Sequence, residues 1–183
     1  MPSLCSSTPA CKDYFPFRDW VLRDWLGMVR WIYWYQGCFP VYLTLYASSN
    51  KNDYTGVGCL RKYNDLALHH NALLRRAIYG LQRKHHGTRI RYADYYNPPL
   101  RFAADPAKYG FTGGGALRAT GSGEYNVNPD KVCAQPGSSV CGDPTTHVSW
   151  DGSHVTEAAC RLIARGWLRG PDAKPPIIRQ PPP

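Results

Sequence analysis

The sequence contains no long apolar run free of charged residues, so no segment is predicted to cross a membrane as a helix. Acidic residues are also scarce: 13 Asp and Glu stand against 22 Lys and Arg, which gives a formal net charge of +9. A basic excess can indicate a nucleic-acid or membrane partner, but here the cations are scattered along the chain. The composition therefore predicts neither a nucleic-acid interface nor stable membrane insertion.

Neither a leader peptide nor a zinc-binding cysteine pattern is apparent. The first residues, MPSLCSSTPACKD, have neither the basic start nor the apolar centre of a secretory signal peptide. No two cysteines are separated by two residues, a spacing common in structural zinc sites. What the chain does have is 183 residues, 43% of them hydrophobic and 13% aromatic, which suffices for one domain with a core.

The seven cysteines cannot all pair within one chain, because their number is odd. Cys133 and Cys141 bracket a Pro-Gly loop, CAQPGSSVC, and this short separation suits a local disulfide in an oxidising compartment. Cys160 falls in a predicted helix and is expected to be a buried thiol rather than a nucleophile. The other pairings and the oligomeric state stay open at this point.

Composition divides the chain into three parts: a Trp-rich segment at 1–36, the main body at 37–172 and a Pro-rich tail at 173–183. In the first part, apolar residues follow helical spacing from Val21 to Val29, whereas the aromatic run at 31–35 equally suits a strand. The segment is expected to pack against the core rather than on a membrane, because aspartates dilute the cations of its polar face. The tail is expected to be extended and mobile.

A long helix and a strand are predicted in the main body. From Leu60 to Leu81 apolar residues recur every three or four positions, which predicts an amphipathic helix of about six turns. Gly87 follows its basic last turn and is a typical stop. Residues 90–93 favour a strand, which Asn97-Pro98-Pro99 would end. A helix followed by a buried strand is typical of an α/β fold.

Two aspartates and two histidines lie in the stretch DPTTHVSWDGSHVTEAA: Asp143, His147, Asp151 and His154. An aspartate bonded to a histidine ring orients it as a general base, and Gly152 permits the turn that brings Asp151 to His154. One alternative is a glycine turn in which Asp151 caps the next helix and His154 is a surface residue. Another is a metal site made from the four acidic and histidine side chains.

The last predicted helix begins directly after this cluster. Thr156 is a typical N-cap residue, because its side-chain oxygen can accept a hydrogen bond from the first turn. Helical spacing predicts a buried face made of Ala159, Leu162, Ile163 and Trp167. The preceding loop is then expected at the mouth of an α/β sheet, where functional sites usually lie.

Several blocks in collinear order resemble the plant GDSL-type esterase/lipase family of SGNH hydrolases. They are GCFPVYLTLY at 37–46, GCLRKYNDLALHHNALL at 58–74, IRYADYYNP at 90–98, KYGF at 108–111, GEYNVN at 123–128 and HVSWDGSHVTEAACRLIARGWLRGP at 147–171. The resemblance implies a flavodoxin-like α/β/α sandwich that hydrolyses carboxylic esters with no cofactor. It also implies that Asp151 and His154 are the acid and base of a Ser-His-Asp triad.

The sequence departs from the family in its other catalytic blocks. The family's nucleophile is the serine of a Gly-Asp-Ser block, and its oxyanion hole uses a glycine and the asparagine of a Gly-x-Asn-Asp block; neither block occurs here. Ser122 is the only serine flanked by glycines, and we expect a turn there, because the strand-turn-helix context of a nucleophile is missing. The resemblance therefore implies the C-terminal part of the domain: a partial sandwich lacking the N-terminal strands, with no nucleophile.

Four functions remain open from the sequence. A truncated family member that is inactive alone is the first expectation. The others are a hydrolase completed by a chain that supplies the serine, a non-catalytic glycan- or lipid-binding module, and the metal site. The resemblance implies a small-molecule or polysaccharide ester as substrate and implies secretion, although no leader is apparent. Apolar surface on the 60–81 helix is expected to lack its usual cover, since only part of a sheet is encoded.

Overall fold

The computed structural model describes residues 37–112, 125, 127–128, 143–150 and 152–178, and about half of these residues are helical. The α-helices are α2 (Pro40–Leu45), α3 (Arg61–Lys84), α4 (Asn97–Ala104) and α5 (Glu157–Arg169). Short 3-10 helices form at Lys51–Asp53, Ala107–Tyr109 and Pro144–Thr146. Pairing of β type in the described ranges consists of three isolated antiparallel bridges, Tyr54–Leu60, Ala93–Ala173 and Ser149–Val155.

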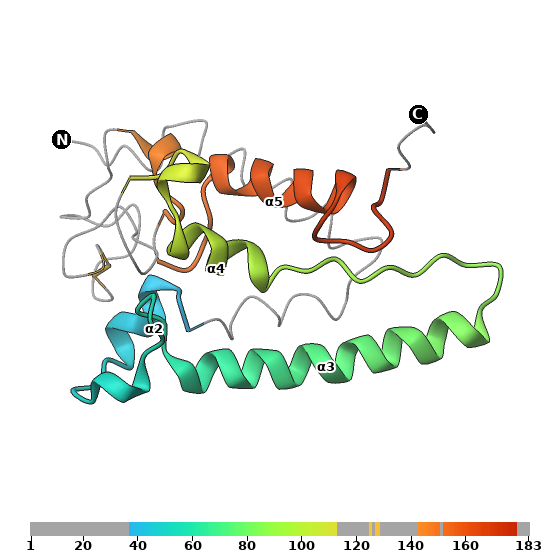
Figure 1. Cartoon of the computed structure of the whole chain (residues 1–183), viewed down its shortest axis with the longest axis horizontal. Coiled ribbons are helices and arrows are strands. Elements are labelled where there is room, and N and C mark those ends of the chain that lie inside the picture. Colours follow the sequence, from blue (N-terminus) through green and yellow to red (C-terminus); the bar gives the residue numbers. More distant parts are fainter. Residues whose placement is uncertain (1–36, 113–124, 126, 129–142, 151, 179–183) are drawn as a thin grey trace.

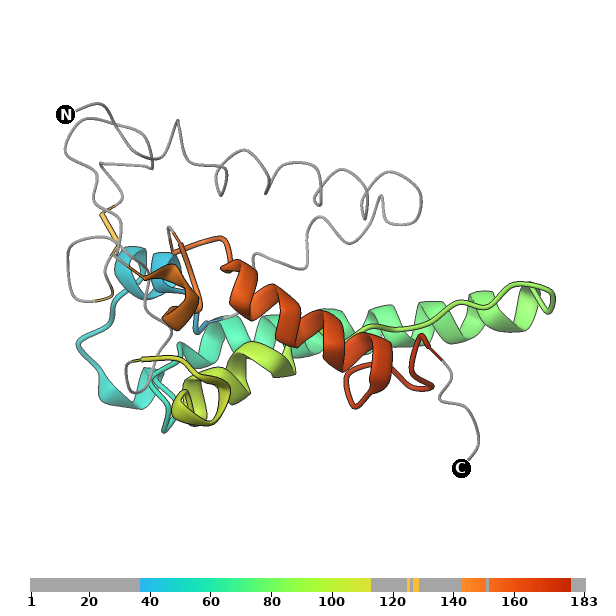
Figure 2. The same cartoon turned by 90° about the horizontal axis from the view of Figure 1, so that it is seen from above.

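The helices form two groups. Helices α4 and α5 lie side by side, and α3 runs along the other side of the molecule with α2 beside its N-terminal end (Figures 1 and 2). The C-terminal half of α3 extends beyond the other helices, and residues 85–96 return from its end as an extended segment (Figure 1). The compact part of the fold therefore gathers around α2, α4 and α5.

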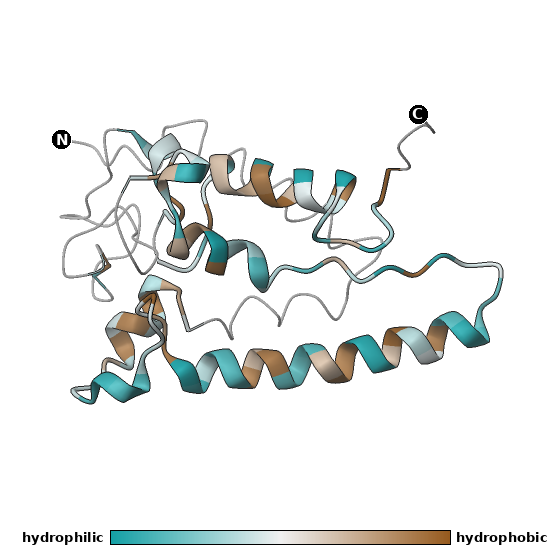
Figure 3. Cartoon of the chain, viewed as in Figure 1, coloured by the Kyte–Doolittle hydropathy of each residue, from teal (hydrophilic) through white to brown (hydrophobic). Residues whose placement is uncertain are grey.

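The long amphipathic helix predicted from Leu60 to Leu81 is confirmed as α3, which continues to Lys84. Its buried side chains are Asn64, Ala67 and Asn71. Apolar residues are spread along the whole helix (Figure 3), and its exposed large hydrophobics are Leu66, Leu68, Leu73, Tyr79 and Leu81. Large apolar side chains of α3 are thus exposed, and the expected lack of a covering sheet stays a prediction.

The strand expected at 90–93 does not form as a strand. Residues 90–92 have no regular secondary structure, and Ala93 alone bridges to Ala173. A strand needs a partner for its backbone groups, and the described part of the chain supplies only that single pairing. The prolines at 98 and 99 do not simply break the chain but begin α4, since proline fits the first helical turn. The helices of the expected α/β fold are thus present, but no strand ladder forms among the described residues.

The core joins segments that are far apart in the sequence. Its buried residues come from the α2 region, the loop before α3, α4 and the segments on either side of it, the loop before α5, and α5. They are Cys38, Phe39, Cys59, Tyr95, Phe102, Ala103, Phe111, Val148, Val155, Ala159 and Ile163. On α5, Ala159 and Ile163 are buried as predicted, while Leu162 and Trp167 pack partly buried against this core. Cys160 is likewise partly buried against the core rather than fully buried.

The beginning of the tail is bound to α5. The Ile177 amide donates to the Trp167 carbonyl at 3.1 Å, and the Ile178 amide donates to the Leu168 carbonyl at 2.9 Å. This differs from the extended, mobile tail that was expected, because the open carbonyls at the end of a helix can accept from the returning chain. Residues 179–183 lie outside the described residues.

Candidate functional site

The loop before α5 is a tight, hydrogen-bonded turn. Ser149 and Val155 pair in an antiparallel bridge. The His154 carbonyl accepts from the Trp150 amide at 2.9 Å and from the Ser149 hydroxyl at 2.8 Å. The Ser149 hydroxyl oxygen also accepts from the Gly152 amide at 3.0 Å. These bonds hold Gly152 and the His154 backbone to Ser149 and Trp150.

Gly152 permits this turn for two reasons. Its φ is 91°, a left-handed conformation that a residue with a Cβ rarely adopts. A Cβ at this position would lie 2.4 Å from the Val127 Cγ2 atom and 3.2 Å from the Val41 amide nitrogen. The Gly152 carbonyl also accepts from that amide at 3.2 Å, which ties the turn to α2. The backbone turn expected at Gly152 is therefore present, while its role in bringing Asp151 to His154 stays a prediction.

His154 is exposed at the tip of this turn, between the partly buried Ser153 and the buried Val155. A general base must be accessible to its substrate, so this placement suits the predicted role. Asp151 and Ser122 lie outside the described residues, so the Asp151–His154 pair and the turn at Ser122 stay predictions. The alternative of a glycine turn with a surface histidine also agrees with the exposed His154, but the N-cap of α5 is Thr156.

Thr156 joins the turn to the helix. Its side-chain oxygen accepts from the Ala159 amide at 3.3 Å and donates to the His147 carbonyl at 2.7 Å, and the residue is 1% exposed. We expect Thr156→Ala to lower the free energy of unfolding by about 1–2 kcal/mol, the usual effect of losing a threonine cap. Urea denaturation measures this loss. Thr156→Ser keeps the hydroxyl and should retain most of the stability; equal losses in the two variants would contradict the cap as the cause.

Asp143 and His147 serve the local structure. Asp143 Oδ1 accepts from the Thr145 amide at 3.0 Å and from the Thr145 hydroxyl at 2.5 Å, and these two bonds lower the pKa of the exposed carboxyl. His147 Nδ1 lies 3.2 Å from the Asp143 carbonyl oxygen and 3.1 Å from the Thr146 hydroxyl. Both side chains are thus engaged within the 3-10 helix at Pro144–Thr146. Across the described ranges, no three His, Cys, Asp or Glu side chains lie close enough to hold a metal ion together.

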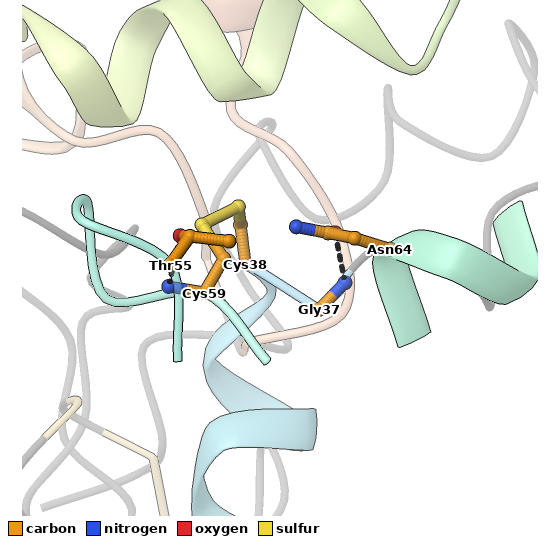
Figure 4. The surroundings of a disulfide bond; sticks show 5 residues. All are labelled: Gly37, Cys38, Thr55, Cys59 and Asn64. Atoms are coloured by element: carbon orange, nitrogen blue, oxygen red, sulfur yellow. Dashed lines mark hydrogen bonds between the residues drawn. A yellow bond between two sulfur atoms is a disulfide. The ribbon is translucent and has the colours of Figure 1, made fainter. Parts of the chain in front are cut away.

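A disulfide joins Cys38 to Cys59, and sequence reasoning missed it (Figure 4). Both cysteines are fully buried, and they fix the loop that carries α2 to the start of α3. The Gly37 amide beside it donates to Asn64 Oδ1 at 2.9 Å, and the Leu60 amide donates to the Gly37 carbonyl at 2.9 Å. Seven cysteines allow many pairings, so no local signal in the sequence identifies this one. The predicted Cys133–Cys141 disulfide lies outside the described residues.

In the part of the chain that the structure describes, no helix combines the length and the apolar character needed to cross a membrane.

Comparison with known proteins gives one consistent result. The GDSL esterase/lipase At1g28590 of Arabidopsis thaliana is 43% identical over 148 residues, which cover 77% of this chain and 37% of the relative. The GDSL esterase/lipase At1g28600 of the same plant is 43% identical over 145 residues, which cover 78% of this chain and 37% of that protein. The sinapine esterase of Brassica napus is 38% identical over 141 residues, which cover 76% and 36%.

No protein-family model and no solved structure matches the chain. The chain spans a little over a third of the length of the curated relatives it matches. Identity at this level over about three quarters of this chain agrees with the collinear blocks found in the sequence. The chain therefore belongs to the plant GDSL esterase/lipase family.

Proposed function

We propose that this chain supplies the aspartate and histidine, Asp151 and His154, of a Ser-His-Asp centre that hydrolyses carboxylic esters, and that the 183-residue polypeptide is inactive alone. In this proposal residues 37–172 are the C-terminal part of a flavodoxin-like α/β/α sandwich whose N-terminal strands are not among the 183 residues. The ester is a small molecule or an acetylated polysaccharide. The exposed His154, on a turn fixed by Ser149 and Gly152, is the observation that carries the proposal.

The relatives support the ester-hydrolysing role, and the sequence supports the inactivity of the chain alone. The relatives are named as esterases or lipases, and one is a sinapine esterase, so an ester is the expected substrate class. Neither a Gly-Asp-Ser block nor a Gly-x-Asn-Asp block occurs in the 183 residues. A triad that loses one member retains about 10³–10⁴-fold catalysis through its oxyanion hole and binding site. Here the nucleophile and the oxyanion donors are missing together, so this source of residual activity is also missing.

The first test uses the 183-residue chain as it is. We expect no hydrolysis of a small acetyl ester above the rate of free imidazole. A general base accelerates a reaction by about 10²–10⁴-fold only when the substrate is held within its reach. His154→Ala should therefore leave the measured rate unchanged. If the purified chain hydrolyses the ester and His154→Ala abolishes this activity, a serine of this chain must be the nucleophile, and Ser122 is the first to replace.

A chimera tests whether His154 acts as the base once the other catalytic blocks are supplied. The part of the Arabidopsis relative At1g28590 that precedes the shared region would be fused ahead of Gly37, so that one chain carries all the catalytic blocks. We expect this chimera to hydrolyse an acetyl ester and to lose about 10⁴-fold or more in kcat when His154 is replaced by alanine. His69→Ala, which changes an exposed histidine on α3, is the matched control and should leave kcat unchanged. An active chimera that tolerates His154→Ala would refute the assigned base.

A second candidate, a glycan- or lipid-binding module, is favoured by one surface feature. The rings of Tyr42, Tyr46 and Tyr63 lie with centroids 4.9–5.9 Å apart. Tyr46 is 50% exposed, and the neighbouring Leu45 is 54% exposed. Exposed aromatic and aliphatic side chains together form a surface on which a sugar ring or an acyl chain packs. Retention on an insoluble polysaccharide or on liposomes that Tyr46→Ala abolishes would support this candidate, and no retention on either would exclude it.

A further inference from the structure

The C-terminal end of α3 and the turn after it carry a strongly basic surface. The sequence has no Asp or Glu from 66 to 93. Figure 1 shows that this end of the helix extends beyond the other helices. Four exposed cations make up the surface, called here the basic end of α3, and they are Arg76, Arg83, Lys84 and Arg89. The surface is therefore both positively charged and accessible.

The described acids do not neutralise these cations. In the described ranges, ion pairs form between Arg101 and Asp172 and between Arg161 and Glu157, and neither pair includes a residue of the basic end of α3. The chain as a whole has a formal net charge of +9. A group of like charges on such a chain produces a positive potential that attracts anionic partners. The charge of this surface thus fits an anionic ligand.

An exposed aromatic ring lies between two of the arginines. Tyr79 is 67% exposed, and the Arg83 guanidinium carbon lies 6.0 Å from the centre of its ring. Arg76 precedes Tyr79 by three positions and Arg83 follows it by four, so the three residues lie along one side of the helix. Along the helix axis the two arginines are about 10 Å apart, at about 1.5 Å per residue. An extended polymer that lies along this side can therefore meet both arginines and the ring.

The turn after α3 is held against the helix by one side chain. Gln82 Nε2 donates to the Thr88 carbonyl at 2.6 Å, and Gln82 Oε1 accepts from the Ile90 amide at 2.8 Å. The Thr88 amide also donates to the His85 carbonyl at 3.0 Å. These bonds fix the turn that carries Arg89 beside the end of the helix. A surface with a fixed backbone loses less conformational entropy on binding than one on a free loop.

The chemistry of the surface fits an acidic sugar. A guanidinium group binds a carboxylate through two parallel hydrogen bonds. An exposed tyrosine ring offers a flat apolar face on which a sugar ring packs. We propose that Tyr79 and the basic end of α3 bind the uronic-acid units of an acidic polysaccharide. A polymer of such units presents carboxylates and sugar rings in alternation, as the two arginines and the tyrosine require.

The site is separate from the features that carry the proposed function. Tyr79 lies sixteen residues after Tyr63, or about 24 Å along α3, so it is not part of the tyrosine cluster at the start of the helix. Asp151 and His154 have no role in it. Binding of the polysaccharide can therefore be present or absent whether or not the chain contributes to ester hydrolysis.

The Cys38–Cys59 disulfide favours a polysaccharide over other polyanions. Disulfides persist in oxidising compartments and are rare in the cytosol and the nucleus, where most nucleic acid is found. Anionic lipids give the cytoplasmic leaflet of membranes its negative surface potential, and a chain in an oxidising compartment does not meet that leaflet. Acidic polysaccharides, in contrast, occur outside the cytosol.

Binding of the 183-residue chain to immobilised polygalacturonate tests the proposal. Biolayer interferometry at one fixed salt concentration measures the affinity, and the same polymer with its carboxyls reduced to alcohols is the uncharged control. We expect binding to the acid polymer and none to the reduced one. No binding to the acid polymer, or equal binding to both, would overturn the proposal. Tighter binding to single-stranded DNA or to phosphatidylserine vesicles at the same salt concentration would also overturn it.

Two double variants remove the same charge from different surfaces. Arg76→Gln combined with Arg83→Gln should raise the Kd for polygalacturonate about tenfold or more, because two charge-assisted contacts are lost. Arg161→Gln combined with Arg165→Gln changes two exposed arginines of α5 and should raise the Kd much less. Equal losses in the two double variants would show that net charge alone binds the polymer, and the assigned site would be wrong.

Variants of Tyr79 test the contribution of the ring. Tyr79→Ala removes the packing face and should weaken binding several-fold, whereas Tyr79→Phe keeps the ring and should bind nearly as the native chain does. Native affinity in Tyr79→Ala would overturn the assignment to a sugar. His154→Ala should bind as the native chain does, so a failure of the proposed function leaves this result unchanged.

Discussion

Replacing Arg101 by methionine is expected to lower the free energy of unfolding by about 3 kcal/mol, because it leaves a buried carboxylate without its cation. Arg101 Nη2 on α4 lies 2.6 Å from Asp172 Oδ1 and 2.7 Å from Asp172 Oδ2. The Asp172 side chain is 5% exposed, whereas that of Arg101 is 39% exposed. Water therefore reaches the pair from the arginine side. The expected loss of stability is accordingly at the lower end of the range for broken buried ion pairs.

The position of Asp172 explains why its partner matters. Its amide donates to the Gly166 carbonyl at 3.0 Å, and its carbonyl accepts from the Asp94 amide at 2.7 Å, so it links α5 to the segment before α4. A Cβ on Gly166 would lie 2.0 Å from Asp172 Oδ2, so the helix must have glycine where the carboxylate packs. Loss of the arginine thus disturbs the junction of α4 and α5.

Chemical denaturation of matched variants measures this effect. Arg161→Met removes the partner of Glu157 in a pair whose side chains are 77% and 72% exposed, and we expect a change of about 0.5 kcal/mol or less there. Combining Arg101→Met with Asp172→Asn should recover part of the stability, since the second change removes the buried charge. Equal losses in Arg101→Met and Arg161→Met would show that the Asp172 junction has no special role.

Local patterns in the sequence predicted the elements that depend on near neighbours. The periodicity from Leu60 predicted α3, and Thr156 predicted the start of α5. Both features depend on contacts within one or two helical turns. The Gly152 turn was predicted for the same reason, since it follows from one residue's φ. For the candidate site, sequence reasoning thus predicted the turn and the helix start, and the structure adds the exposure of His154.

Features that depend on distant residues could not be read from local patterns. Residues 90–93 have strand-forming side chains, but a strand also needs a partner, and only Ala93 finds one, 80 positions away at Ala173. Arg101 and Asp172 are 71 positions apart, and nothing in either sequence neighbourhood indicates the other. The disulfide is a third example, because seven cysteines allow many pairings and only the fold brings Cys38 to Cys59.

Replacing both Cys38 and Cys59 by alanine is expected to lower the free energy of unfolding by about 3 kcal/mol. The bond closes a loop with a sequence separation of 21, and cross-links of this span restrict the unfolded chain by about that amount. For a chain of this size the loss corresponds to a decrease in Tm of about 6–12 °C. Both sulfur atoms also belong to the buried core, so their removal leaves space beside Phe39 as well.

Thermal melts with and without dithiothreitol separate this disulfide from the predicted Cys133–Cys141 bond. Dithiothreitol should lower the Tm of the native chain towards that of the double variant, because reduction and substitution remove the same bond. Cys160→Ala changes a partly buried cysteine on α5 that is not in a disulfide, and we expect it to shift Tm much less than the double variant does. A further decrease in the Tm of the double variant on reduction would reveal a second stabilising disulfide, for which Cys133 and Cys141 are the predicted pair. If the double variant melts at the temperature of the native chain, the Cys38–Cys59 bond does not hold α2 against α3, and the bonds of Gly37 with Leu60 and Asn64 must suffice for that junction.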